Sequence, residues 1–275
     1  MNETVASASA AAPASLLGWG GALVLAAFRG VGRVLALGYL AFKSAWLERR
    51  RGGVVLRRVL AAQVFFTGVQ ALPVIVFTAV ALGTLVITQT MSFLPFLGGA
   101  TEAARVAFWV VVRELAPLFT ALIVIGRSGT AITTELGNMK LDRELEVLES
   151  LGINRNYFVV FPRLLGVTAA VVALTVVFAV AALAGGYVVT AALELAPLPF
   201  HAGAFLDVLV FRDVVLSVVK AGFFGFFIAL LHCHHGLSLE KAVTEVPRLT
   251  TRAVVQSIFL CFGLNVFLSV VVFPV

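Results

Sequence analysis

The chain has 275 residues, of which 61% are hydrophobic and only 12% are charged. A typical soluble domain is about half apolar and about a quarter charged. With a mean hydropathy of +1.06, the chain has more apolar surface than one globular core could hide. Composition therefore excludes a soluble enzyme and a disordered or fibrous chain, and it predicts an all-α integral membrane protein. The net charge of +6 is read as a membrane topology signal, so no nucleic acid is expected as a partner.

The amino-terminal segment, residues 1–52, is predicted to form helices that lie in the cytoplasmic interface of the membrane. Trp19 and Trp46 are typical interfacial anchors, and six glycines weaken a straight span. Three internal charges would be costly at mid-bilayer: Arg29, Arg33 and Lys43. The alternative is a sixth span, which would move the amino terminus to the outside.

Residues 53–275 are predicted to form a domain of five transmembrane helices. The expected spans are roughly 58–90, 105–133, 157–193, 207–234 and 253–273. Lys and Arg are frequent before the first span and in alternate connections, and they are nearly absent from the others. The positive-inside rule then places the amino terminus in the cytoplasm and the carboxyl terminus outside. Four or six spans would break this alternation.

The connection between the second and third spans predicts a short amphipathic helix over about 137–152, ended by Gly152 as a C-cap. Leucines recur at helical spacing at Leu141, Leu145 and Leu148. The acids fall mostly on other faces and are Asp142, Glu144, Glu146 and Glu149. Such a helix could dock into a groove on a soluble partner. The alternative, a helix resting on lipid headgroups, is disfavoured because the cytoplasmic leaflet is itself negative.

Five sequence blocks have the order and spacing found in one membrane-protein family. They are Arg113-Glu-Leu-Ala-Pro117, Gly126-Arg-Ser-Gly-Thr-Ala-Ile132, Glu135-Leu-Gly-Asn-Met139, Glu146-Val-Leu-Glu-Ser-Leu-Gly152 and Phe161-Pro-Arg163. Lys220 and the stretch 250–255 match as well. Over about residues 55–273 the chain therefore resembles the MlaE/YrbE-type permeases, the membrane subunits of ABC transporters that work with MCE proteins.

The resemblance implies a machine in the bacterial inner membrane. Such permeases form a homodimer beneath a periplasmic ring of MCE proteins, and a cavity at the dimer interface holds lipid, usually phospholipid. Each copy offers a coupling helix to a cytoplasmic ABC ATPase, and a small cytoplasmic regulatory subunit can join the complex. The residues that the resemblance assigns to the ATPase contact are Glu135, Met139, Leu141, Glu144, Leu145, Glu146, Leu148 and Glu149. No cofactor is expected on this chain: it has no phosphate-binding Gly-x-x-x-x-Gly-Lys-Ser/Thr loop, so ATP and Mg would bind the partner ATPase.

The first span contains Pro73 and several polar residues, a pattern that indicates a bend or a cavity lining. By resemblance, this helix lines the lipid cavity near its outer end. The candidates for the lining are Leu85, Gln89 and Met91. Ordinary packing between two copies of the chain is the alternative.

Arg113, Glu114 and Lys220 lie within predicted spans, where an isolated charge costs about 2.5–3.5 kcal/mol. Neighbours on a helix point about 100° apart, so Arg113 and Glu114 are expected to be poor partners for one another. A pair between Glu114 and Lys220 across two helices is more reasonable. It would either couple helix movement to release of a lipid headgroup or form a purely structural bridge.

Two further features have competing interpretations. Arg127 could be a snorkelling residue at a packed helix end or part of a gate. His232, Cys233, His234 and His235 could suggest a metal site. Consecutive helical residues point in different directions and no carboxylate is near in sequence, so an interfacial helix end is the favoured interpretation.

The chain departs from the family pattern in two places. The segment before Thr250 has its acid, Glu245, shifted by one position and has an added Pro247. Asn265 stands where the last span of these permeases often carries an acid.

The leading interpretation is a permease subunit that moves lipid between the inner and outer membranes. The first alternative is an intramembrane lipid-modifying enzyme, which would need an acid, base or nucleophile clustered at one membrane depth. The second is a membrane scaffold that binds partners without transport.

Overall fold

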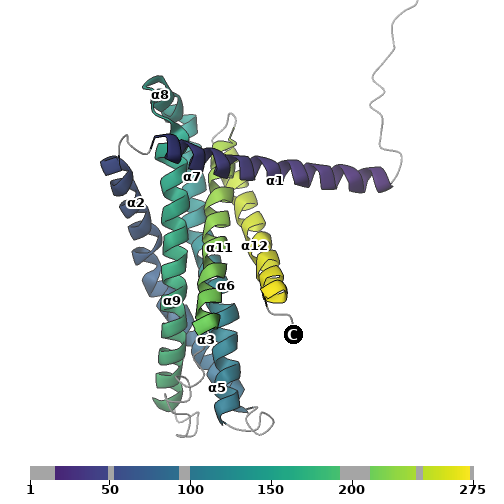
Figure 1. The fold of residues 1–275 in the computed structure, drawn as a ribbon, viewed down its shortest axis with the longest axis vertical. Coiled ribbons are helices and arrows are strands. Elements are labelled where there is room, and N and C mark those ends of the chain that lie inside the picture. Colours follow the sequence, from purple (N-terminus) through teal and green to yellow (C-terminus); the bar gives the residue numbers. More distant parts are fainter. Residues whose placement is uncertain (1–15, 49–52, 93–99, 193–210, 240–243, 273–275) are drawn as a thin grey trace, which may run out of the picture.

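The computed structural model describes residues 16–48, 53–92, 100–192, 211–239 and 244–272, and every regular element in these ranges is a helix (Figure 1). Five helical runs are long and apolar enough to cross a membrane, namely Leu56–Thr90, Arg105–Leu141, Asn156–Ala192, Phe211–Leu237 and Glu245–Val271. The all-α fold and the five spans predicted from the sequence are therefore confirmed. The predicted span boundaries near residues 193, 207 and 273 lie outside the described residues.

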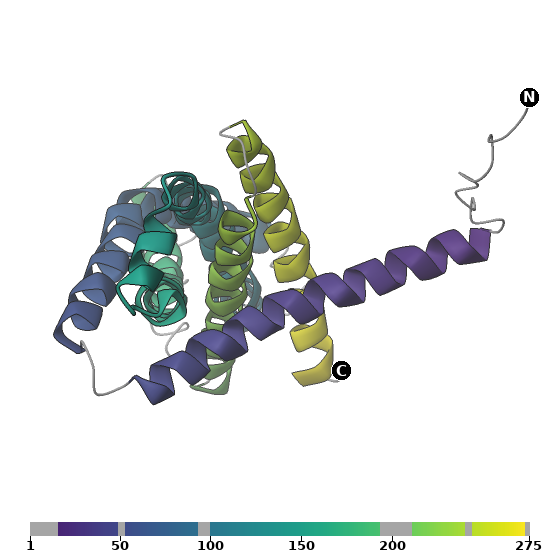
Figure 2. The same ribbon diagram turned by 90° about the horizontal axis from the view of Figure 1, so that it is seen from above.

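The first helix, α1 (Leu16–Leu47), runs across one end of the bundle and not along it (Figures 1 and 2). It is one continuous helix of 32 residues. The sequence, with its six glycines, had predicted several helices in this segment. Each glycine costs a helix only about 1 kcal/mol, which an otherwise apolar helix with tertiary contacts tolerates. The Phe42 ring packs edge-on against Phe161 at 5.6 Å, and Ser44 accepts a hydrogen bond from Asn154 at 3.1 Å. Its direction favours the interfacial interpretation over a sixth span.

The first span is interrupted. It consists of α2 (Gly53–Thr67), the 3-10 turn η1 (Val69–Ala71) and α3 (Leu72–Ser92). Pro73 stands in the first turn of α3, where its missing N–H removes no intrahelical bond. The α-helix is interrupted a few residues before Pro73.

The second span contains two π-helical turns. Its segments are α5 (Ala100–Phe108), η2 (Trp109–Leu115), α6 (Ala116–Val124), η3 (Ile125–Gly129) and α7 (Thr130–Leu141). The span therefore continues eight residues beyond the Thr133 end that hydropathy predicted. Wide turns of this kind rotate the side chains that follow them and are frequent at functional sites.

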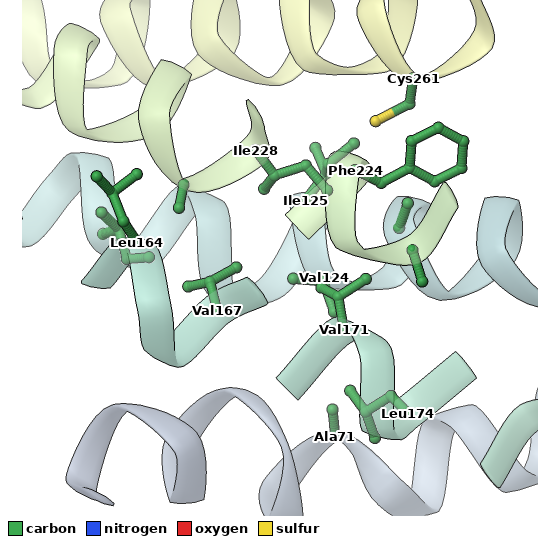
Figure 3. Packing of buried hydrophobic residues seen from close by; sticks show 14 of the residues in the cluster. Ala71, Val124, Ile125, Leu164, Val167, Val171, Leu174, Phe224, Ile228 and Cys261 are labelled. Carbon is green, nitrogen blue, oxygen red and sulfur yellow. The ribbon is translucent and has the colours of Figure 1, made fainter. Parts of the chain in front are cut away.

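The remaining described helices follow the second span along the chain. They are α8 (Glu144–Ser150), η4 (Asn156–Val160), α9 (Phe161–Ala192), α11 (Phe211–Leu237) and α12 (Glu245–Val272). In the close-up of Figure 3, Leu164, Val171 and Leu174 of α9 lie among buried side chains of the helices around them.

The approach of α3 to α9 depends on small residues. A Cβ at Gly83 would overlap the backbone of Ala182, and one at Gly186 would lie 2.6 Å from the carbonyl carbon of Gly83. Helix α12 is the least enclosed, because only 11% of its most apolar stretch is buried within the chain, against 50% for α11. Its outer face is therefore left for lipid or another subunit.

Candidate functional site

The predicted amphipathic helix lies beyond one end of the bundle, which we call the α8 end, while α5 lies at the other (Figure 1). The single helix expected over 137–152 is two helices, because α7 ends at Leu141 and α8 begins at Glu144. Between them Arg143 has a φ of 58°, in the left-handed region. This turn redirects the chain, so α8 does not continue the axis of the second span.

The predicted C-cap is confirmed. Gly152 has a φ of 73°, a conformation that glycine adopts without the steric cost of a Cβ. The N–H of Ile153 donates to the carbonyl of Leu148 at 2.9 Å, and the N–H of Gly152 donates to that of Glu149 at 3.0 Å. These two bonds are the pattern of a Schellman motif. They end α8 and turn the chain back toward η4.

Helix α8 has one face against the bundle and one face in the open. Leu145 is only 4% exposed, and Leu141, Leu148 and Met139 are partly buried. On the open face lie the acids and two apolar side chains: Glu144, Glu146, Glu149, Val147 and Leu151. Among the described residues, Glu149 pairs with Arg155 at 3.2 Å, whereas neither Glu144 nor Glu146 forms an ion pair. This mixture of acids and apolar side chains suits a protein partner better than a lipid headgroup layer.

Helix α7 connects α8 to the core through two polar contacts. Arg163 of α9, which is buried, donates to Glu135 at 2.7 Å and to the carbonyl of Val159 at 2.8 Å. Lys140 donates to the carbonyl of Leu237, the last residue of α11, at 2.7 Å. Glu135, assigned by resemblance to a partner surface, thus has a partner within its own chain. Any displacement of α7 acts on α9 and α11 through these contacts.

The predicted pair between Glu114 and Lys220 is present. The Lys220 ammonium, on a side chain only 3% exposed, donates to both carboxylate oxygens of Glu114 at 3.0 Å. It also donates to Ser269 Oγ at 2.8 Å, to Asn265 Oδ1 at 3.3 Å and to the carbonyl of Arg113 at 3.2 Å. Three spans therefore meet at one charged centre, which we call the polar cluster: Arg113, Glu114, Lys220, Asn265 and Ser269.

Arg113 was expected to be a poor partner for Glu114, and the structure has a long ion pair between the two. Its Nε lies 3.5 Å from Glu114 Oε1. Both residues stand in η2, where the π-helical turn changes the angle between successive side chains, and both side chains are long. A wheel drawn for a regular α-helix could not show this contact.

The hydrogen bonds of Asn265 show how a neutral side chain fits at the position where the last span often carries an acid. Its amide NH₂ donates to Glu114 at 2.9 Å while its carbonyl oxygen accepts from Lys220. A carboxylate could accept from the lysine but could not donate to the glutamate. Ser269 lies one helical turn later on the same face and donates to Glu114 at 3.0 Å. Sequence reasoning missed Ser269, although its spacing of four from Asn265 was a usable signal.

The structure describes the side chains of two of the three lipid-cavity candidates. Leu85 is 57% exposed and Gln89 is also exposed, both on the last turns of α3. Met91 belongs to the same helix, but its side chain lies outside the described residues. Both described side chains point away from the chain's own core, as a cavity lining or a contact between two copies requires.

The histidines do not converge. His232 is fully buried, with Nδ1 2.7 Å from Thr133 Oγ1, whereas His235 contacts Gln256 at 2.8 Å. Within the described residues, no three His, Cys, Asp or Glu side chains are arranged to hold a metal ion. Cys233 and Cys261 are both buried free thiols.

Comparison with known proteins adds the decisive observation. The family described as Permease MlaE matches residues 60–271, which is most of the chain. The chain belongs to the MlaE permease family. The relatives of this MlaE permease include a probable ABC transporter permease protein of Rickettsia bellii, 29% identical over 221 residues, covering 79% of this chain and 84% of that protein.

Two further relatives widen the comparison. A probable ABC transporter permease protein of Synechocystis is 28% identical over 221 residues, covering 80% of this chain and 84% of that protein. The intermembrane phospholipid transport system permease protein MlaE of Haemophilus influenzae is 26% identical over 220 residues, covering 78% and 83%.

The fold of this MlaE permease brings the sequence blocks together at two places. Blocks 135–139 and 161–163 meet at the α8 end through the pair of Glu135 with Arg163, and block 146–152 covers most of α8 itself. The block that begins at Arg113 joins Lys220 and Asn265 in the polar cluster. The sequence had not indicated roles for Arg163 or Lys140, because their partners are distant along the chain.

The departure at Glu245 and Pro247 from the family pattern has a simple structural basis. Helix α12 begins at Glu245, eight residues before the predicted start at Ala253. Pro247 therefore falls in the first helical turn, where proline is tolerated, and Glu245 lies favourably at the positive end of the helix dipole.

Proposed function

We propose that this chain is the permease subunit of an ABC transporter that moves phospholipid between the inner and outer membranes. A separate cytoplasmic ATPase would bind α8, and a periplasmic MCE protein ring would cover the opposite end of a homodimer. The observation that carries the proposal is the open face of α8 in a chain of the MlaE permease family. That face offers Glu144 and Glu146, which form no ion pair with a described residue, beside Val147 and Leu151, and the helix ends at the Gly152 cap.

The proposal fixes the orientation of the chain. The α8 end and the amino terminus would be cytoplasmic, and the carboxyl terminus would be periplasmic, as the positive-inside rule predicts. ATP and Mg would bind the ATPase, because this chain has no phosphate-binding loop. A small cytoplasmic regulatory subunit can join at the ATPase.

The contacts of α7 suggest how the work of ATP binding would reach the lipid. Closure of two ATPase subunits would displace α8, and α7 would transmit the displacement to α9 through Glu135 and to α11 through Lys140. Helix α11 carries Lys220, so the displacement would also reach the polar cluster. The lipid cavity would lie between two copies, next to the exposed Leu85 and Gln89 of α3.

Co-purification tests the proposal. The tagged chain is extracted from its own membranes in mild detergent, and mass spectrometry identifies co-eluting subunits and bound lipids. The proposal predicts an ABC ATPase, an MCE protein and phospholipid in one complex. Turnover of lipid by the chain alone would instead support an intramembrane enzyme. Partners without any change in lipid distribution would support a scaffold.

The polar cluster has its own test. In the reconstituted complex, Glu114→Gln is compared with the wild type for lipid-stimulated ATPase activity and for dimer assembly. A role in coupling predicts lower stimulation with intact assembly. Unchanged values of both would end the coupling role of this residue.

A further inference from the structure

Helices α2 and α3 are separated by a break, and one side chain from another span bridges it. The last four carbonyls of a helix have no donor within the helix. At the end of α2, the carbonyl of Val64 accepts from the N–H of Gly68 at 2.7 Å. The carbonyl of Phe66 accepts instead from Arg127 Nη1, at 2.9 Å.

The same guanidinium reaches the far side of the break. Arg127 Nη2 donates to Gln70 Oε1 at 2.8 Å, and Gln70 belongs to η1, which leads into α3. The guanidinium carbon also lies 5.1 Å from the centre of the Phe66 ring. A planar fork with two donors and a stacking face fits this arrangement, and an ammonium group could not reproduce all three contacts.

Arg127 is itself held firmly on the other side. It stands in the π-helical turn η3, and the neighbouring Gly129 packs so closely on His232 of α11 that a Cβ there would lie 2.5 Å from Nε2. One turn later, Thr133 contacts His232 Nδ1. Thus η3 is fixed to α11 and reaches α2 and η1 through Arg127. Its described acceptors, the Phe66 carbonyl and the Gln70 amide oxygen, are both neutral.

We propose that Arg127 is a positioning residue for transport. By bonding Phe66 and Gln70 together, it sets the angle between α2 and α3. It thereby links the span that carries α7 and α8 to the helix that carries Leu85 and Gln89. This inference rests on the proposed function, because it names the route by which a displacement at α8 would reach the lipid cavity.

The experiment compares Arg127→Gln and Arg127→Lys with Arg105→Gln as the matched control. Arg105 lies on the same span, and among the described residues its side chain bonds Glu102 and none of the residues at the break. Each variant is purified as the full complex. Spin labels at positions 57 and 77, both exposed and on opposite sides of the break, report the angle between α2 and α3.

For Arg127→Gln we expect a broader distance distribution and at least about fivefold less lipid transported per ATP hydrolysed, while hydrolysis and assembly are retained. Arg127→Lys should recover part of the transport, and Arg105→Gln should match the wild type. A role confined to stability would lower assembly, hydrolysis and transport together, and that result would overturn the inference.

The two proposals can fail separately. If wild type and Arg105→Gln transport lipid and Arg127→Gln does so equally well, the positioning role is wrong and the proposed function stands. If the wild type neither retains an ATPase nor transports lipid, the proposed function is wrong. In that case the distances between the two spin labels, measured in the isolated chain, test the positioning role. A distance distribution that is no broader in Arg127→Gln than in the wild type overturns it.

Discussion

The polar cluster and helix α8 differ in how their charged side chains are paired. In the polar cluster, Glu114 accepts from Lys220, Asn265 and Ser269, and its ion pair is enclosed by three spans. On α8, Glu144 and Glu146 are exposed and form no ion pair with a described residue. Charges that a fold needs for itself are satisfied inside it. The unsatisfied charges of α8 are therefore the ones to test for an external partner.

The largest expected effect comes from reversing those unpaired charges. The double change Glu144→Lys and Glu146→Lys should reduce ATP-driven lipid transport at least about tenfold, because like charges placed across an interface cost several kcal/mol. Thermal unfolding of the chain alone should not change, since both side chains are exposed. Transport in proteoliposomes and unfolding in detergent are measured on the same preparation.

The control for this reversal is Glu102→Lys, an exposed acid on α5, at the end of the bundle opposite to α8. Equal loss of transport in the control would show that the effect depends on charge in general and not on α8.

The next effect is on stability, at the polar cluster. Glu114→Ala leaves the Lys220 ammonium without its carboxylate, and breaking a buried pair in this way costs about 3 kcal/mol. Glu114 itself is 35% exposed, so the lower part of the usual range is expected. Denaturant unfolding in detergent measures the change.

Glu102→Ala removes the pair of Glu102 with Arg105, whose side chains are 49% and 45% exposed. The free energy of unfolding of this variant should stay within about 0.5 kcal/mol of the wild type. If both variants lost the same stability, the distinction between enclosed and exposed charges would be wrong.

A smaller effect tests the close packing of α3 against α9. Gly83→Ala places a methyl group into the backbone of Ala182 and should destabilise the chain by about 1–3 kcal/mol. Gly126→Ala, where no atom lies within 4 Å, should be neutral or slightly stabilising. Thermal unfolding of the two variants gives the comparison, and a neutral Gly83→Ala would refute the close approach of α3 to α9.

The smallest effect is local to α8. Gly152→Ala forces an alanine into the left-handed conformation, at a cost of about 1 kcal/mol. Amide hydrogen exchange should become faster over 144–151 and stay unchanged in α9. Unchanged exchange at α8 would mean that the glycine cap does not hold this helix.

Much of this architecture follows from sequence, for identifiable physical reasons. Span number depends on hydropathy, and the pair of Glu114 with Lys220 follows from the cost of an isolated charge in lipid. The cap at Gly152 follows from the freedom of glycine. Hydropathy and the glycine cap concern one residue or one short segment. The pair of Glu114 with Lys220 joins distant residues, but each charge in lipid needs an opposite charge as its partner.

The rest depends on geometry that a sequence pattern does not contain. The π-helical turn η2 contains Arg113 and Glu114, and η3 contains Arg127, but no residue type marks either turn. The left-handed Arg143 splits one expected helix into two without a glycine as a signal. Arg163 and Arg127 find acceptors 28 and 57 positions away, contacts that only the packed bundle defines.

The central claim is that an ATPase grips the open face of α8 from the cytosol. A photoactivatable amino acid at position 146, in the intact complex in its own membrane, tests this most directly, with position 145 as the buried control. The account predicts a crosslink from 146 to an ABC ATPase subunit and little or none from 145. Absence of such a product at 146, or labelling of 146 by an impermeant reagent from the periplasmic side, would contradict it.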